Sequence, residues 1–251
     1  MEISDCVERE PVTVVLVVDK EQNQKSDKSG ISERKSKIKN EISMYKYCKR
    51  FVGFMIALVA LIILFIPLVI VAILIKLDSK GPVIFKQERL GKDGVPFKIW
   101  KFRSMFVGAE KQGTGVYSYK GDARITKVGK IIRATSIDEL PQLVNILKGD
   151  MALIGPRPAL TYHPWPYDQY TDHQKHMFDV LPGVTGWAQV NGRKEVPWPE
   201  RIELNVWYAK NMSMWLDIKI FFMTIFKVAT NANNENVGET GVKSKTGRQS
   251  G

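Results

Sequence analysis

Residues 133–158, RATSIDELPQLVNILKGDMALIGPRP, hold the helix and turns from which the fold can be predicted. Apolar residues recur at helical spacing in the middle of this stretch: Leu140, Leu143, Val144 and Leu147. Pro141 is compatible with a helix only in the first turn, where the N–H that proline lacks would be unpaired anyway. The pattern therefore predicts a helix that begins near Asp138 and ends at Lys148-Gly149.

The adjacent carboxylates of Asp138 and Glu139 fall at the N-terminus of this predicted helix. The helix dipole and the unpaired N–H groups at such a terminus favour the anionic form of a side chain. An ionised carboxylate can act as a nucleophile or a metal ligand and is poorly suited to be a general acid. An ordinary helix start has the same pattern, with Ser136 or Asp138 as N-cap and Glu139 as a first-turn charge. The pair alone therefore does not identify an active site.

A long apolar segment precedes this region. Residues 51–75 are 25 residues without a charge, enough to cross a bilayer as one helix. Pro67 should break that helix, and basic residues flank both of its ends: Lys46, Lys49, Arg50, Lys76 and Lys80. Because both flanks are basic, the positive-inside rule selects no orientation, as expected if both ends face the cytoplasm. The residues fit a re-entrant helix-break-helix hairpin and a kinked spanning helix equally well.

We predict an α+β fold, in which a membrane-embedded hairpin precedes a compact cytoplasmic domain of short helices and a small β-hairpin. The segments VIFKQERL and PFKIWKF flank the turn GKDG within residues 81–105, a pattern typical of a β-hairpin. Two further segments suit a membrane surface: the aromatic-rich residues 161–180 and the apolar helix expected over 213–228. A helix of the protein core fits residues 213–228 equally well. The predicted parts are a charged, mostly disordered tail (1–44), the membrane hairpin (45–80), the folded domain (81–230) and a second disordered tail (231–251).

Composition argues against several classes of function. The net charge is +11, of which residues 81–230 carry +7, and this suits anionic lipids and phosphorylated substrates as well as DNA. No helix-turn-helix, zinc-finger or RNA-binding motif accompanies the charge, so we expect no nucleic-acid partner. The sequence has no GxxxxGK[ST] or GxGxxG motif, which argues against an ATPase or a dinucleotide enzyme. Cys6 and Cys48 form no disulfide framework, which fits a cytosolic environment.

Several long motifs occur together in one order: KIWKFRSM, DARITKVGKIIRATSIDELPQLVNILKGDMALIGPRP, LPGVTGWAQVNGR and LDIKI. In this order and spacing the chain resembles the bacterial sugar transferases over roughly residues 45–229. These enzymes are monotopic polyprenyl-phosphate phosphoglycosyltransferases, and the chain is similar to their small, catalytic-core form. The resemblance makes residues 81–230 the expected catalytic domain.

The resemblance implies a reaction and roles for individual residues. Asp138 matches the nucleophilic aspartate, which attacks the β-phosphorus of a UDP-sugar, so that UMP leaves and an aspartyl-phosphosugar intermediate remains. Undecaprenyl phosphate then accepts the sugar phosphate. Glu139 matches the ligand of an essential Mg²⁺. Positive charge is needed beside these phosphates, and we expect it from the metal and from four basic residues: Lys101, Arg133, Arg157 and Arg193.

The resemblance also implies a place in the cell and partners. Pro67 matches the break of a re-entrant membrane hairpin, which favours the hairpin over a spanning helix. The expected location is the bacterial cytoplasmic (inner) membrane, with the catalytic domain on the cytoplasmic face. The expected partners are a UDP-sugar, undecaprenyl phosphate, membrane lipids and downstream glycosyltransferases. The reaction would be the first membrane step of capsule, exopolysaccharide, O-antigen or glycoprotein glycan synthesis. The alternative is a non-catalytic membrane scaffold of a polysaccharide assembly complex, and the sequence leaves the donor sugar open.

Overall fold

The computed structural model describes residues 12–111, 121–192 and 196–230, with side chains from Met44 onward. The chain divides into two compact units, Met1–Cys48 and Lys49–Gly251. The described part of the first unit is the N-terminal portion of helix α1 (Val12–Asp78). Helix α1 therefore begins within residues 1–44, which we had predicted to be mostly disordered.

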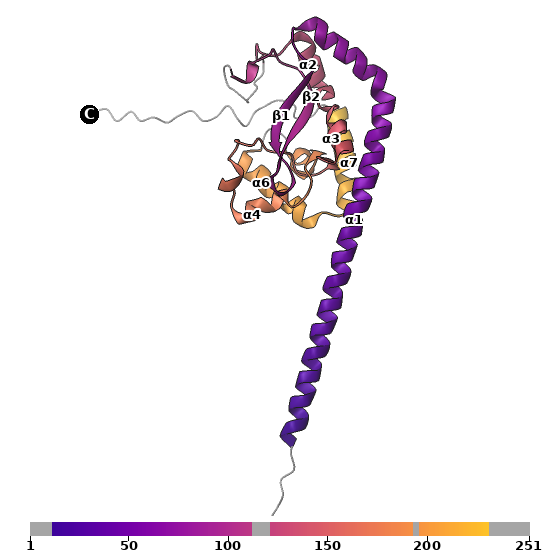
Figure 1. Ribbon diagram of the computed structural model, residues 1–251, viewed down its shortest axis with the longest axis vertical. Helices are drawn as coiled ribbons and strands as arrows, with labels where there is room; N and C mark the ends of the chain where they lie inside the picture. The colour runs from indigo at the N-terminus through magenta and orange to yellow at the C-terminus, as the bar shows by residue number, and fades with distance from the viewer. Residues whose placement is uncertain (1–11, 112–120, 193–195, 231–251) are drawn as a thin grey trace, which may run out of the picture. The chain divides into compact units, whose positions relative to one another are not determined.

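Helix α1 continues through Pro67. The predicted break does not divide it into two helices, although Figure 1 shows that α1 bends in its C-terminal part. Proline removes one backbone hydrogen bond and crowds the carbonyl four residues earlier, and a helix commonly accommodates this as a kink. Between Met44 and Asp78, α1 is long and apolar enough to cross a membrane.

The predicted β-hairpin is confirmed. Strand β1 (Ile84–Leu90) pairs antiparallel with β2 (Pro96–Phe102), in a register that places Phe85 opposite Lys101. The connection contains the 3₁₀ turn η1 (Lys92–Gly94). Gly94 has a φ of 73°, a left-handed conformation that glycine adopts without the strain of a Cβ atom.

Short helices follow the hairpin: η2 (Ala109–Lys111), α2 (Lys127–Ala134), η3 (Ile137–Glu139) and α3 (Gln142–Lys148). Thr126 caps α2 by accepting a hydrogen bond from the Gly129 amide at 2.9 Å. Helix α3 ends at Lys148 with Gly149 in the left-handed conformation (φ 86°), which confirms the predicted helix end.

A second, parallel strand pair was not predicted. Strand β3 (Ala152–Ile154) pairs with β4 (Gly183–Thr185), and the Gly155 amide donates to the Thr185 carbonyl at 2.8 Å. A Cβ atom at Gly186 would lie 1.9 Å from the Gly155 carbonyl oxygen, so only glycine allows this approach of the two chains. The remaining elements are η4 (Tyr167–Gln169), α4 (Asp172–Lys175), η5 (His176–Phe178), α5 (Trp187–Val190), α6 (Trp198–Asn211) and α7 (Met214–Ala229).

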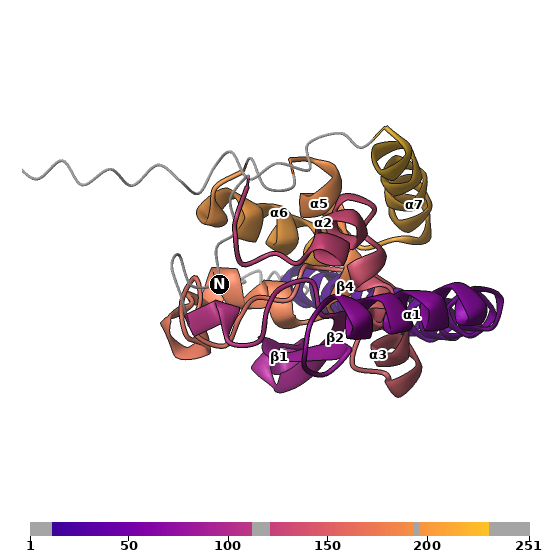
Figure 2. The same ribbon diagram turned by 90° about the horizontal axis from the view of Figure 1, so that it is seen from above.

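The C-terminal part of α1 packs on the domain in two places. Ala57 and its neighbours contact β2 and α3 through Ile99 and Leu143, and Figure 2 shows β2 and α3 beside α1. Further along, Ile75 packs with Phe102 and Ile132. These contacts lie on both sides of Pro67 in the sequence, and they hold the bent helix against the hairpin and α2.

Two polar clusters fix the ends of this packed segment. At its C-terminal end the buried guanidinium of Arg103 donates to the carbonyls of Ile75, Ser79 and Lys80 at 3.3, 2.7 and 2.9 Å. Ser79 and Lys80 directly follow the last residue of α1, so these contacts hold the turn in which the helix ends. At its N-terminal end Lys49 forms an ion pair with Asp217 of α7 at 2.8 Å.

Most of the aromatic-rich segment 161–180 forms core, which corrects the predicted membrane-surface role. Tyr170 and Phe178 are buried with residues of α6. Trp165 and Tyr167 pack against the same cluster, and the rings meet edge to face at centroid distances of 5.2–5.6 Å. Aromatic rings fill a core as readily as they face lipid headgroups. Composition alone could not decide between these locations.

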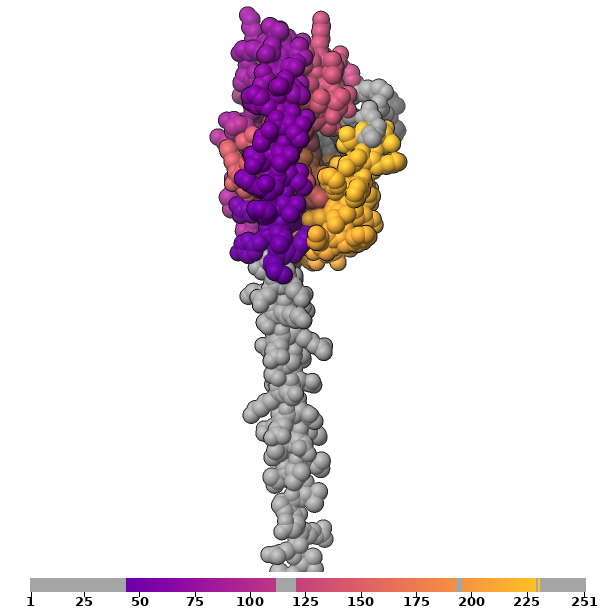
Figure 3. Space-filling model, turned by 90° about the vertical axis from the view of Figure 1, so that its right-hand side faces the viewer, coloured from indigo at the N-terminus to yellow at the C-terminus, as the bar shows by residue number. Residues whose placement is uncertain are grey.

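The outer sides of α1 and α7 are apolar and exposed. On α7 the exposed residues include Met214, Trp215, Phe222 and Phe226. On α1 between residues 51 and 77 they include Phe51, Ile62, Ile63, Phe65, Ile66 and Leu77. Figure 3 shows α1 in indigo and α7 in yellow and orange side by side on one face of the molecule. We call this the α1–α7 face.

Candidate active site

Asp138 and Glu139 lie on the 3₁₀ turn η3. The sequence analysis had placed them in the first turn of the following α-helix, but α3 begins only after this turn. Ser136 adopts a left-handed conformation (φ 59°) directly after α2. The Glu139 amide then donates to the Ser136 carbonyl at 3.2 Å, and this spacing is typical of a 3₁₀ turn. Pro141 is the N-cap of α3, so the α-helix begins at Gln142, three residues after Glu139. The turn directs both carboxylates into the cavity described below.

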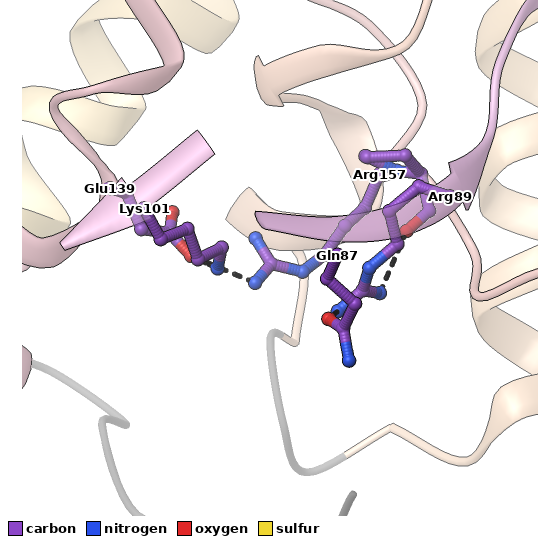
Figure 4. Close-up of polar contacts among 6 residues, drawn as sticks. Gln87, Arg89, Lys101, Glu139 and Arg157 are labelled. Atoms are coloured by element: carbon purple, nitrogen blue, oxygen red, sulfur yellow. Dashed lines mark hydrogen bonds and ion pairs between the residues drawn. The ribbon is translucent and has the colours of Figure 1, made fainter. Parts of the chain in front are cut away.

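Glu139 is held by two cations. Lys101 Nζ and Arg157 Nη2 both donate to Glu139 Oε1, at 2.7 and 2.9 Å. Figure 4 shows Lys101 and Arg157 approaching this carboxylate from different parts of the chain. Burial alone would raise the pKa of Glu139, but Arg157 and Lys101 outweigh it and hold that pKa well below its usual range. Glu139 is therefore an anion at neutral pH.

The Asp138 carboxylate differs from that of Glu139 in its contacts and in its pKa. No hydrogen bond or ion pair joins its carboxylate to another described residue. Burial raises the pKa of Asp138 against the attraction of Lys101, and the charge of Glu139 raises it further. The sequence argument from the helix terminus expected both carboxylates to be stabilised as anions. That expectation is wrong for Asp138, because loss of solvent and a like charge exceed the effect of the local cations.

Arg89 is a site residue that the sequence analysis missed. It donates to the Pro158 carbonyl at 3.1 Å and to Gln87 Oε1 at 2.7 Å, and Figure 4 shows Arg89 beside Gln87. Burial and the nearby charge of Arg157 lower the pKa of Arg89 to about 10, so the side chain stays cationic at neutral pH. The feature that could have revealed Arg89 is the pairing of the hairpin strands, which places Gln87 and Arg89 on the same face as Lys101.

These side chains line one cavity of about 670 Å³. Its lining contains every predicted site residue of the transferase domain that the structure describes: Lys101, Arg133, Asp138, Glu139 and Arg157. Arg193 lies outside the described residues, and Pro67 lies in α1 away from this lining. The cavity therefore places a carboxylate without a direct partner among several cations, an arrangement suited to an anionic, phosphorylated substrate.

The donor set fits a Mg²⁺ ion that shares its coordination with a substrate. No group of three or more His, Cys, Asp or Glu side chains gathers as a metal cage within the described ranges. Mg²⁺ commonly binds through one or two carboxylates together with phosphate oxygens and water. Glu139 Oε1 is occupied by Lys101 and Arg157, whereas its Oε2 makes no hydrogen bond with the described residues.

Comparison with known proteins identifies the family. Residues 44–231 match the bacterial sugar transferase family. This chain belongs to that family. The match extends from the apolar part of α1 to the end of α7 and so includes the cavity and the α1–α7 face.

Individual bacterial sugar transferases resemble the chain closely. The UDP-glucose:undecaprenyl-phosphate glucose-1-phosphate transferase of Escherichia coli (strain K12) is 46% identical over 179 residues, which cover 68% of this chain and 38% of that protein. The uncharacterized sugar transferase EpsL of Bacillus subtilis (strain 168) is 44% identical over 176 residues, 70% of this chain and 81% of EpsL.

A third relative acts on another sugar. The UDP-N-acetylgalactosamine-undecaprenyl-phosphate N-acetylgalactosaminephosphotransferase of Aeromonas hydrophila is 44% identical over 191 residues, 74% of this chain and 45% of that protein. The chain thus spans less than half the length of the E. coli and A. hydrophila proteins.

Proposed function

We propose that this protein transfers a sugar-1-phosphate from a UDP-sugar to undecaprenyl phosphate and releases UMP. The observation that carries the proposal is the Asp138 carboxylate, which makes no hydrogen bond or ion pair with the described residues and lies in a cavity lined by Lys101, Arg133 and Arg157. The names of the E. coli and A. hydrophila relatives support the same reaction class.

In the first step an Asp138 carboxylate oxygen attacks the β-phosphorus of the donor. A bond forms between that oxygen and phosphorus, and the bond from the β-phosphorus to the bridging oxygen breaks. UMP leaves with the bonding electron pair, and the sugar phosphate remains on Asp138. In the second step a phosphate oxygen of undecaprenyl phosphate attacks the same phosphorus, and the Asp138 carboxylate leaves unchanged.

The cations of the cavity make this attack between anions possible. An anionic carboxylate and a diphosphate repel one another strongly in a partly buried site. Lys101 and Arg157 bind Glu139 directly and act on Asp138 through space, and Arg133 acts on Asp138 from α2. We propose Glu139 as a ligand of Mg²⁺, which when bound supplies further positive charge to the phosphates. A raised pKa also makes the ionised Asp138 a more basic and therefore stronger nucleophile.

We further propose that residues 45–80 enter the cytoplasmic leaflet of the bacterial inner membrane and return to the same side. The support is that both ends of the apolar segment bind the same domain, through Lys49–Asp217 at one end and Arg103 at the other. A spanning helix would place its ends on opposite sides of a bilayer about 30 Å thick. The exposed α1–α7 face supplies the lipid-facing surface (Figure 3), and a cytoplasmic domain meets UDP-sugars where they are made.

The test is release of UMP by detergent-purified protein with Mg²⁺, undecaprenyl phosphate and a panel of donors. The panel contains UDP-glucose, UDP-galactose and UDP-N-acetylgalactosamine, because the relatives named above use different sugars. We expect UMP from one donor, and its loss in Asp138→Asn. Release of UDP in place of UMP would show ordinary glycosyl transfer and contradict the proposal.

A further inference from the structure

One wall of the cavity carries buried polar atoms that make no hydrogen bond with any residue that the structure describes. Gln189 on α5 contributes Oε1 and Nε2, and α6 contributes Trp198 Nε1 and Asn205 Oδ1. None of these four atoms has a hydrogen-bond partner within the described part of the chain, and all three residues line the cavity that contains Asp138. Asn205 is only 1% exposed. We call these three residues the amide wall.

Unpaired buried polar atoms need an explanation. Native proteins pair nearly all such atoms, because an unpaired one has lost its water without replacement. Four of them on two packed helices in one cavity are best explained by a ligand that completes their hydrogen bonds. The three residues of the amide wall carry no formal charge, in contrast to the cations around Glu139, so they suit an uncharged part of a ligand better than its phosphates.

The kinds of atom indicate the chemistry of this ligand. Two of the four are donors, Gln189 Nε2 and Trp198 Nε1, and two are acceptors, Gln189 Oε1 and Asn205 Oδ1. A hydroxyl group both donates and accepts, so a ring with several hydroxyls can satisfy all four. Uracil offers a single N–H donor on its imide edge, which leaves one of the two acceptors unsatisfied. The amide wall therefore fits a polyhydroxylated ring better than it fits a base.

We propose that Gln189, Trp198 and Asn205 bind the hexosyl ring of the donor and set which sugar is accepted. This inference rests on the proposed function. The donor has two hydroxylated rings, the hexose on the β-phosphate and the ribose on the uridine side. The hexose is attached to the phosphate that Asp138 attacks, so it must lie in the cavity that Asp138 and the amide wall share.

The experiment compares two variants that remove the unpaired atoms while keeping side-chain size, Gln189→Met and Asn205→Leu. Tyr170→Phe is the matched control, because the Tyr170 hydroxyl is also buried and unpaired but lies outside the cavity lining. Three quantities are measured for each protein: kcat/KM for each donor, inhibition by UMP, and the temperature of unfolding. UMP carries the ribose and the base but no hexose, so it distinguishes the two rings.

We expect each amide-wall variant to lower kcat/KM for the preferred donor about tenfold or more and to narrow the preference between donor sugars. Inhibition by UMP should change less than about twofold, and unfolding temperature should stay equal or rise, because no protein hydrogen bond is lost. Tyr170→Phe should leave kcat/KM unchanged.

Two results would overturn the inference while leaving the proposed function in place. One is unchanged kcat/KM and donor preference in both variants of an active enzyme. The other is a loss of UMP inhibition as large as the loss of kcat/KM, which would show that the amide wall binds the ribose. A lower unfolding temperature with no change in donor preference would show a structural role and also overturn it. Failure of the wild-type protein to release UMP from any donor would contradict the proposed function itself.

Discussion

Asp138 and Glu139 are adjacent in the chain, yet their pKa values move in opposite directions. Burial raises that of Asp138, whereas Arg157 and Lys101 overcome burial and lower that of Glu139. The two cations reach Glu139 directly at 2.7 and 2.9 Å and act on Asp138 only through space. Two neighbouring carboxylates thereby suit different roles, one as the reacting group and the other as a fixed anion.

The raised pKa of Asp138 predicts the pH dependence of activity. In the proposed mechanism Asp138 attacks as an ionised carboxylate, so kcat should fall as the pH is lowered through the folded-state pKa of Asp138. This fall should begin at a higher pH than that of an ordinary aspartate. The measurement is UMP release between pH 4.5 and 8 with saturating substrates. A rate that stays constant down to the usual aspartate range would contradict the role of burial.

The raised pKa of Asp138 also predicts that Asp138→Asn abolishes activity without lowering stability. Turnover should fall by about a thousandfold or more, because the amide is not a nucleophile. A raised folded-state pKa favours the protonated form on folding, so the stability that goes with it is lost as pH rises through that pKa. The neutral amide avoids this loss, and the unfolding temperature at pH 7 should equal or exceed that of the wild type. A large decrease would show that the ionised carboxylate stabilises the fold.

Glu139→Gln should destabilise the protein at neutral pH. The variant leaves Lys101 and Arg157 close together without their shared anion, a loss of about 2 kcal/mol for a partly buried pair. Because the folded-state pKa is lowered, this stabilisation is present above the unfolded pKa of about 4.3 and is lost as pH falls. Denaturant unfolding at pH 7.5 and at pH 4 tests the direction of this pH dependence. The difference in the free energy of unfolding between variant and wild type should be smaller at pH 4. In a separate assay, the activity of the variant should respond less to Mg²⁺ than that of the wild type.

The features that local chemistry determines were predictable from the sequence. The turn GKDG specified the hairpin, and Gly149 specified the end of α3. The five candidate residues chosen from the family motifs line one cavity, and the family match confirms the resemblance on which that choice rested.

The features that depend on packing were not predictable in this way. Arg89 enters the site through its contact with Pro158, which is 69 residues away in the chain. The amide wall exists only because α5 packs against α6. Helix α1 continues through Pro67, and contacts on both sides of the proline hold the helix to the domain. Tyr170 and Phe178 occupy a core that only the folded chain reveals.

The ion pair between Lys49 and Asp217 should stabilise the attachment of α1 to α7. Tyr208 donates to Asp217 at 2.6 Å, and burial lowers the pKa of Lys49 against the opposing effect of Asp217. Asp217→Leu leaves Lys49 partly buried and unpaired, and should cost about 3 kcal/mol. The double variant Lys49→Met with Asp217→Leu should recover most of that loss. Thermal unfolding in detergent measures all three proteins, and equal stability of the single and double variants would contradict the coupling.

The re-entrant arrangement predicts that both ends of the apolar segment face the cytoplasm. Single cysteines are introduced at Lys46 and at Lys80, in a Cys6→Ser and Cys48→Ser background that removes both native thiols. Neither position should react with a membrane-impermeant maleimide in intact spheroplasts, and both should react after permeabilisation. The reason is that Lys49 and Arg103 attach the two ends to one domain. Labelling of one cysteine from outside would establish a spanning helix and would require one of these two attachments to be broken in the membrane.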